Sequence, residues 1–236
     1  MKASVAEIPV LTLLHGRARP FARGQNSAIE KSEIGGPIRI GELGLEGDEQ
    51  ADLRHHGGVE KAVHHYAYDH YAGWKNDLRG CSDELLAAPG AFGENISTLG
   101  LTEEDVCVGD IWRVGTVLLQ VSQARQPCWK LSQRFGIDDM AERVQTSGRT
   151  GWYYRVLESG STAAGDLMSL VERPHADWPL SRILQTFYVD LLDRRTLEGI
   201  LGLEELTASW RTLAQRRLES GRIEDWTPRL KGESGP

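Results

Sequence analysis

The sequence predicts a mainly β domain with a few helices, of barrel or sandwich type, followed by a small helical domain. Short runs of β-branched or alternating apolar residues recur through residues 1–172, and glycine separates them at high density. From residue 176 onward the apolar spacing becomes helical. With 236 residues and 40% apolar content, the chain is long enough for a medium and a small domain, which we place at residues 1–174 and 175–236.

The β-rich part is expected to contain six strands and two helices. The strands are predicted at residues 9–16, 36–44, 110–115, 116–123, 150–160 and 167–172. Gly115 lies between two of them, where a tight hairpin would fit. One helix is predicted over residues 64–78, where aromatic residues have near-helical spacing. The other follows Pro127 through residues 129–135, because proline is favoured in a first helical turn.

Residues 176–230 are predicted to form a compact helical bundle. Two apolar faces with helical spacing support this prediction. The first face consists of Leu180, Ile183, Leu184, Phe187 and Leu191, and the second of Leu203, Leu206, Trp210 and Leu213. A short helix is expected between them, at residues 196–202.

Composition excludes several classes of protein. A net charge of −7 and a pI near 5.5 argue against a nucleic-acid partner. No segment approaches the roughly 18 apolar residues of a membrane span, so no membrane partner is expected. The first residues lack the pattern of a signal peptide. The cysteines, Cys81, Cys107 and Cys128, are widely spaced, which argues against a disulfide framework and fits a reducing cytoplasm.

Cys128 lies between Arg125 and Lys130 in the stretch VSQARQPCWKL. Positive neighbours favour the thiolate, which is both the nucleophile and the metal ligand. The predicted helix start at this position would add to that effect. A cysteine is also a common small core residue. The local sequence therefore leaves two readings open for Cys128, a reactive centre or a packed side chain.

A second polar region covers residues 43–66. Five of the seven histidines lie between His55 and His70, but their spacing does not match a zinc motif such as HExxH. The Gly57-Gly58 pair, with His56 before it and Lys61 after it, could bring backbone N–H groups close to an anion. An ordinary Gly-Gly turn is the alternative. Asn95, in the stretch AFGENIST, offers a polar contact or simply a turn.

Taken together, four stretches resemble the MOSC family, whose members are related to the C-terminal domain of molybdenum-cofactor sulfurase. In chain order they are GLEGDEQADLRHHGG, AFGENISTLGLTEEDVCVGD, LLQVSQARQPCWKL and SGRTGWYYRVL. The resemblance covers residues 5–172 and is greatest to the YiiM-like branch, in which a three-helix domain follows the MOSC domain. It implies a MOSC-type β-barrel that binds molybdenum cofactor of the molybdopterin type, and it gives no reason to expect pyridoxal phosphate.

The resemblance also implies roles for particular residues. Cys128 would be the protein ligand of molybdenum, as its thiolate is a soft ligand. The cofactor-binding residues carried over by position are Lys31, His56, Gly57, Gly58, Lys61, Asn95, Ser122, Arg125 and Cys128. For Lys31, a solvated surface lysine is the alternative. His56 and His64 are the candidates for a catalytic proton donor, because histidine titrates near neutral pH.

The chain departs from the family pattern at two positions. Ala124 stands where the commoner motif, QPRxPC, has proline, which leaves the backbone before Arg125 less constrained. Gln25 stands where some relatives carry a basic residue, which would weaken one phosphate contact.

The activity that the resemblance implies is reduction of N-hydroxylated compounds, such as hydroxylaminopurine-type base analogues, as a detoxification. An external electron-donor protein would be the partner, because we see no flavin or iron–sulfur motif. The helical domain is a candidate docking surface for that donor. The alternatives are a non-catalytic molybdenum cofactor carrier and an interaction protein with a structural Cys128. The oligomeric state stays open, with a homodimer as one option.

Overall fold

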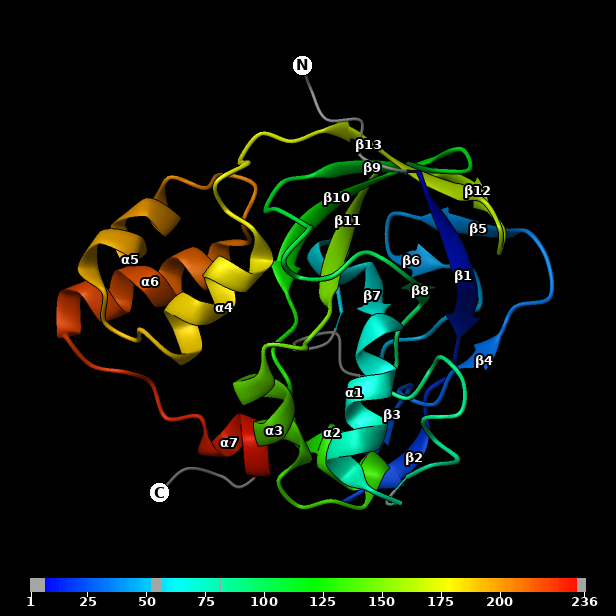
Figure 1. Cartoon of the computed structure of the whole chain (residues 1–236), viewed down its shortest axis with the longest axis horizontal. Helices are drawn as coiled ribbons and strands as arrows, with labels where there is room; N and C mark the ends of the chain where they lie inside the picture. Colours follow the sequence, from blue (N-terminus) through cyan, green and yellow to red (C-terminus); the bar gives the residue numbers. More distant parts are fainter. Residues whose placement is uncertain (1–6, 52–56, 81, 233–236) are drawn as a thin grey trace.

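The structure is a computed structural model of the chain, and it describes residues 7–51, 57–80 and 82–232. At its centre, seven of the described strands close into a β-barrel (Figure 1). They are neighbours in the order β13 (Leu167–Glu172), β9 (Ile111–Val114), β10 (Val117–Ala124), β11 (Trp152–Glu158), β7 (Val63–Ala67), β8 (Ile96–Thr98) and β1 (Ile8–His15). β1 pairs with β13 and closes the barrel, and the β7–β8 pair is parallel. The predicted mainly β class is confirmed.

Short strands extend the barrel. β2 (Arg19–Ala22) and β3 (Gln25–Ser27) form a hairpin, and β4 (Ser32–Glu33) pairs with the end of β1. β5 (Ile38–Gly41), β6 (Gly44–Leu45) and β12 (Gly160–Thr162) form a separate three-stranded sheet. A 3₁₀ turn, η1 (Val59–Lys61), precedes β7.

The predicted hairpin at Gly115 is present. Val114 pairs with Val117 across a two-residue turn, and Gly115 has a φ of +55°. A Cβ at this position would lie 2.4 Å from the carbonyl oxygen of Ser161. Glycine is therefore required both by the backbone conformation and by the close approach of the neighbouring chain.

The helix predicted over residues 64–78 is shorter than expected. Residues 63–67 form β7, and α1 (Asp69–Leu78) begins after it. Every residue of β7 is buried, because the strand lies between β11 and β8. Residues 63–67 form a strand because they pair with a neighbouring strand on each side. The near-helical aromatic spacing applies only to the second half of the segment.

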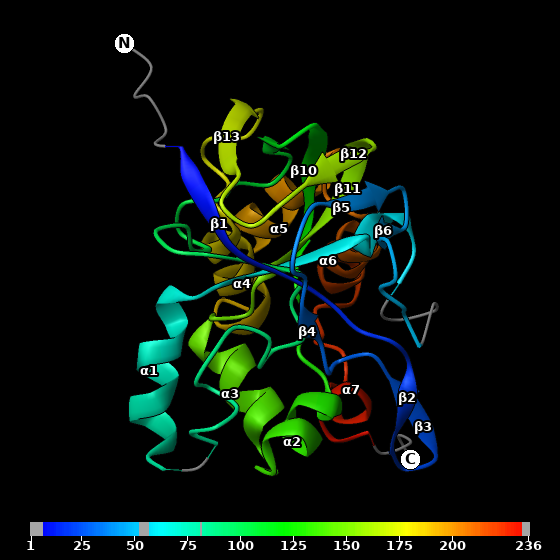
Figure 2. The ribbon, with the colours of Figure 1, turned by 90° about the vertical axis from the view of Figure 1, so that its right-hand side faces the viewer.

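A second hydrophobic core lies below the barrel, between α1, α2 (Trp129–Phe135) and α3 (Met140–Ser147) (Figure 2). Phe92 is at its centre, stacked on Tyr66 with ring centroids 4.0 Å apart and in contact with Phe135. The helix that follows Pro127 was predicted, whereas α3 was not. This core supports the end of the barrel at which Cys128 lies.

The C-terminal region forms α4 (Leu180–Tyr188), α5 (Arg194–Leu201) and α6 (Ala208–Ser220), close to the predicted helices. Leu191 lies beyond the end of α4, and Leu203 and Leu206 precede α6, so these three residues of the predicted helical faces are outside the helices. Their buried faces join the barrel interior in one continuous hydrophobic cluster. Backbone hydrogen bonds tie the two parts together, as from Leu180 to Val106 and from Thr207 to Ser122. A further short helix, α7 (Thr227–Lys231), was not predicted.

Two negative findings concern the described parts of the chain. Neither Cys107 nor Cys128 forms a disulfide there. In the same residues, no helix combines the length and the apolar character that a bilayer crossing requires.

Candidate functional site

A cavity of about 90 Å³ lies where the ends of β7, β10 and β11 meet the start of α2. The basic side chains of Lys31, Lys61, Arg125 and Lys130 line it. So do the predicted site residues His64, Asn95 and Cys128. Segments far apart in the sequence therefore converge on one positively charged cavity that contains a cysteine.

Lys31 is held by a buried carboxylate. Its Nζ lies 2.5 and 2.6 Å from the two oxygens of Asp48, and both side chains are almost fully buried. Asp48 also accepts hydrogen bonds from the backbone N–H of Gly16 at 2.7 Å and from the side-chain amide of Asn95 at 2.8 Å. Burial lowers the pKa of Lys31, and the charge of Asp48 opposes that shift. Lys31 is thus not the solvated surface lysine that was the alternative.

Asn95 joins this ion pair to β7. Its side-chain oxygen accepts the backbone N–H of His64 at 3.0 Å, and its backbone N–H donates to the His64 carbonyl at 2.7 Å. Its amide nitrogen donates to Leu14 as well as to Asp48. Within the described residues its side chain contacts Leu14, Asp48 and His64, so Asn95 positions the cavity wall.

His64 is held in one tautomer when it is neutral. Its Nδ1 lies 3.2 Å from the carbonyl oxygen of Gly93, which can only accept, so Nδ1 carries the proton. Nε2 is buried and has no hydrogen-bond partner within the described chain. Burial, reinforced by the nearby charge of Arg125, holds the pKa of His64 well below its usual range. At neutral pH His64 therefore offers a lone pair rather than a proton.

Arg125 follows β10 and is fixed by its backbone. Its N–H donates to the carbonyl of Gly151 at 2.9 Å, and its side chain is largely buried. The guanidinium Nη1 is buried and has no hydrogen-bond partner in the part of the chain that the structure describes. A buried cationic nitrogen without an acceptor is costly, so this position suits an anionic ligand.

Tyr153 faces the same cavity from β11. It is the register partner of His64 across the β11–β7 pair, and the two ring centroids are 5.0 Å apart. Burial raises the pKa of the Tyr153 phenol, with Arg125 opposing and the sulfur of Cys128 adding to the shift. The hydroxyl therefore keeps its proton at neutral pH and can act as a hydrogen-bond donor.

Cys128 occupies the position just before α2 and is 6% exposed. Lys130, two residues further on, donates from Nζ to the carbonyl of Asn26 at 3.2 Å. Both side chains line the cavity with Arg125, so the charged surroundings predicted for this cysteine are present.

The remaining predicted residues lie elsewhere. Ser122 is fully buried, is not among the lining residues, and hydrogen-bonds through its hydroxyl with the carbonyls of Glu60 and Tyr153. Its predicted contact with a cofactor therefore does not fit this structure, because both acceptors belong to the barrel framework.

The glycine step also differs from its prediction. Gly58 has a φ of +90°, and its N–H donates to the side-chain oxygen of Gln50 at 3.1 Å, so this amide is already used. Neither Gly57 nor Gly58 lines the cavity. His56 lies outside the described residues.

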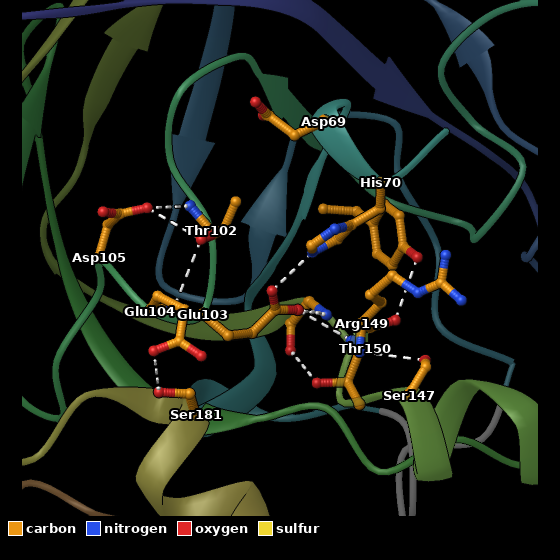
Figure 3. Close-up of polar contacts among 12 residues, drawn as sticks. Asp69, His70, Thr102, Glu103, Glu104, Asp105, Ser147, Arg149, Thr150 and Ser181 are labelled. Atoms are coloured by element: carbon orange, nitrogen blue, oxygen red, sulfur yellow. Dashed lines mark hydrogen bonds and ion pairs between the residues drawn. The ribbon is translucent and has the colours of Figure 1, made fainter. Parts of the chain in front are cut away.

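A second buried polar cluster is centred on Glu103 (Figure 3). One carboxylate oxygen accepts the N–H groups of Thr150 and Gly151 at 2.8 and 2.7 Å, and the other lies 2.6 Å from Nε2 of His70. The backbone carbonyl of Glu103 accepts the N–H of Ser181 at the start of α4. Glu103 thus links the helical domain to Gly151, on whose carbonyl the Arg125 backbone depends.

Sequence reasoning missed several contributors to the cavity, among them Asp48, Lys130 as a lining residue, and Tyr153. For Tyr153 a signal was present. Trp152 and Tyr154 are fully buried in the barrel, so alternation directs Tyr153 to the other face of β11. For Asp48 no local pattern distinguishes it from the neighbouring acidic residues of LEGDEQ.

Comparison with known proteins gives consistent matches. A family model described as the MOSC domain matches residues 52–169, and a model described as a YiiM-like, 3-alpha helix domain matches residues 178–221. The chain is 40% identical over 218 residues to the Escherichia coli (strain K12) protein YiiM, covering 92% of this chain and 96% of that protein. The crystal structure of YiiM from Escherichia coli superposes with a TM-score of 0.80 at 35% identity, covering 95% of this chain and 98% of the other.

A longer relative carries a functional name. A protein of Gibberella moniliformis named "Reductase" is 41% identical over 177 residues, which is 74% of this chain but 31% of that protein.

Proposed function

This chain belongs to the MOSC family, with a YiiM-like three-helix domain behind its MOSC domain, and we propose that it is a molybdenum-cofactor-dependent reductase of N-hydroxylated compounds. The observation that carries the proposal is the cavity. It combines the thiol of Cys128 with a buried guanidinium nitrogen of Arg125 that has no partner within the described chain. The name of the fungal relative supports the reductase part.

The residues present fit such a cofactor. A soft thiol for the metal and cationic side chains for an anionic phosphate lie in one cavity. Among the described residues, no group of three or more His, Cys, Asp or Glu side chains could hold a metal ion. Cys128 would therefore be a single protein ligand, and the cofactor itself would supply the others.

The charges divide into two groups. Lys31 is neutralised by Asp48, so we assign it to the framework of the site. Arg125, Lys61 and Lys130 line the cavity and would hold the anionic end of the cofactor. When bound, the cofactor supplies the two-electron chemistry that the protein's own side chains lack.

The reaction consumes two electrons and two protons. In a compound R–NH–OH the N–O bond breaks, the oxygen leaves as water and the product is the amine R–NH₂. The electrons would come from an external electron-transfer protein. Hydroxylaminopurine-type base analogues are substrates of this class.

The proton supply favours Tyr153 over His64. Nδ1 of His64 is used by Gly93 and its Nε2 carries no proton when the ring is neutral, so His64 suits a hydrogen-bond acceptor. Tyr153 keeps its proton and can donate to the oxygen of the N–OH group. Of the two histidine candidates, His56 lies outside the described residues, and Tyr153 takes the place of His64 as proton donor in this proposal.

Metal analysis tests the cofactor. Wild type, Cys128→Ser and the control Cys107→Ser are purified side by side from a host that makes the cofactor. We expect molybdenum and pterin in the wild type and in Cys107→Ser, and neither in Cys128→Ser. Equal, near-zero contents in all three, even after reconstitution with released cofactor, would refute the role of Cys128.

Turnover tests the reductase. Loaded protein is supplied with a reduced viologen dye, a one-electron donor, and an N-hydroxylated base. We expect two dye molecules oxidised for each amine formed. Replacing Tyr153 with Phe is expected to lower kcat by about 10²-fold, the lower range for general-acid catalysis. An unchanged kcat would show that the proton comes from solvent and not from Tyr153.

A cofactor carrier is the second candidate, because the neutral state of His64 leaves the cavity without an imidazolium acid. A carrier would bind the cofactor and oxidise no dye. It would instead transfer molybdenum to a cofactor-free acceptor enzyme and restore the activity of that enzyme. Dye oxidation coupled to amine formation would exclude a purely carrier role.

A further inference from the structure

The last described helix, α7, does not pack in the helical bundle that precedes it. After α6 the chain runs back toward the MOSC domain, and α7 lies beside α2 and α3 (Figures 1 and 2). The match to the three-helix domain model ends at residue 221, before α7 begins at Thr227. The segment therefore lies outside the residues matched to that domain.

Arg229 connects α7 to the residue before Cys128. Its Nη1 donates to the carbonyl oxygen of Pro127, and its Nη2 donates to the side-chain oxygen of Gln145 in α3 at 2.5 Å. Gln145 is buried. One guanidinium thus bridges α3 and the peptide that leads into Cys128, with charge-assisted hydrogen bonds to both.

A second contact holds the residue after Cys128. The guanidinium of Arg23, from the β2–β3 turn, lies over the ring of Trp129 at 4.8 Å and donates to the carbonyl of Lys231 in α7 at 2.6 Å. Gly232 ends α7 with a φ of +67°, and a Cβ there would lie 2.8 Å from the Trp129 ring. The end of α7 therefore fits closely against Trp129.

We infer that α7 is a strap that fixes the Pro127–Trp129 segment, and that Arg229 is a positioning residue for the thiol of Cys128. The strap holds the chain on the two sides of the cysteine, at the Pro127 carbonyl through Arg229 and at the Trp129 ring through Arg23 and Gly232. The thiol is then held at the cavity with little exposure to solvent. The inference rests on the proposed function only for its consequence, which is a preorganised metal ligand.

Thiol alkylation tests the strap without any cofactor. Cofactor-free protein is treated with iodoacetamide, and labelling of Cys128 and Cys107 is followed separately by peptide mass spectrometry. Cys107, 3% exposed and in contact with the carbonyl of Ala176, reports global opening. We expect Arg229→Ala to label Cys128 about tenfold faster than wild type, because local opening becomes easier, and to leave Cys107 unchanged.

Matched variants sharpen the result. Arg229→Lys keeps one donor for the Pro127 carbonyl and should restore most of the protection. Arg222→Ala removes an exposed arginine from the segment that leads to α7 and should change neither rate. Gly232→Ala should speed labelling of Cys128, because the added methyl group would push α7 away from the Trp129 ring. This variant replaces Arg229→Ala in the test if Arg229→Ala does not fold.

Two outcomes would overturn the strap. Unchanged labelling of Cys128 in both Arg229→Ala and Gly232→Ala would show that α7 does not hold the segment. Equal acceleration at Cys107 and Cys128 would show global destabilisation instead. Because neither readout involves molybdenum, failure here is distinct from failure of the proposed reductase function.

Discussion

Two buried polar regions meet at Gly151, and they differ in how completely their hydrogen-bonding groups are paired. On one side, both carboxylate oxygens of Glu103 are used, by His70 and by the N–H groups of Thr150 and Gly151 (Figure 3). On the other side, Arg125 Nη1 and His64 Nε2 are buried without a partner in the described chain. The two regions are joined by Gly151, whose N–H donates to Glu103 and whose carbonyl accepts the N–H of Arg125.

The difference separates structural from functional polar groups. A fully paired buried network adds stability, whereas an unpaired buried donor costs stability unless something completes it. Glu103 and its partners therefore read as framework. We interpret Arg125 Nη1 and His64 Nε2 as ligand-binding groups, and the backbone of Arg125 is held to that framework by the carbonyl of Gly151.

Breaking the paired region should have the largest effect. Glu103→Ala removes the acceptor of two buried N–H groups and of His70, and should lower the free energy of unfolding by about 3–5 kcal/mol. The neighbouring Glu104→Ala, at an exposed position, should cost less than about 1 kcal/mol. Denaturation in urea measures both. Similar small losses in the two variants would contradict the assignment of Glu103 to the framework.

His65 in β7 allows a test of how stability depends on pH. His65 is fully buried between the hydroxyls of Tyr154 and Thr98, and burial lowers its pKa to about 3. The unfolded chain binds a proton near pH 6.5 that the folded protein does not take up until about pH 3, so stability falls as the pH falls through this window.

The contribution of His65 to this loss should be about 2 kcal/mol between pH 7 and pH 5, because each pKa unit corresponds to about 1.4 kcal/mol. His65→Gln should lack that part of the pH dependence, as measured by urea denaturation at both values. If variant and wild type lost stability in parallel, His65 would be protonated in the folded protein.

Arg155 and Arg125 allow the same comparison, between paired and unpaired hydrogen-bonding groups, for two single residues. Arg155 has partners for its guanidinium in Glu60, Gln120 and the carbonyl of Glu205. Arg155→Met should lower the free energy of unfolding by about 1–3 kcal/mol, allowing for the partial exposure of Glu60. Arg125→Met should change it by less than about 1 kcal/mol, because the lost hydrogen bond with Tyr153 is offset by removal of the buried Nη1, which has no partner among the described residues.

Inorganic phosphate should distinguish Arg125, as an anion-binding residue, from Arg155. We expect phosphate to raise the Tm of the wild type and of Arg155→Met, as a ligand of the native state does, and to leave that of Arg125→Met unchanged. A phosphate response that survives in Arg125→Met would place anion binding elsewhere.

The smallest effect concerns Ser122. Its hydroxyl bonds only framework carbonyls among the described residues, so Ser122→Ala should cost about 1 kcal/mol of stability. The molybdenum content after purification should equal that of the wild type. A loss of molybdenum without a matching loss of stability would restore Ser122 to the cofactor site.

Much of this arrangement could be predicted from local sequence. The alternation in residues 116–123 and the glycine at 115 specify a hairpin, and the apolar spacing after residue 180 specifies α4. Cys128 was singled out because its neighbours are basic. The resemblance to a known family then grouped Cys128 with Lys31 and Arg125, which do line one cavity.

The sequence by itself determined the strands with clear alternation, the helices with one apolar face, and the residue types available for chemistry, because these depend on near neighbours in the chain. Only the tertiary structure decided that residues 63–67 form a strand, that Lys31 is neutralised by Asp48, and that α7 reaches back to Pro127. These outcomes depend on partners distant in the sequence. Burial, pairing and the absence of water at such contacts are set only when the whole chain has folded.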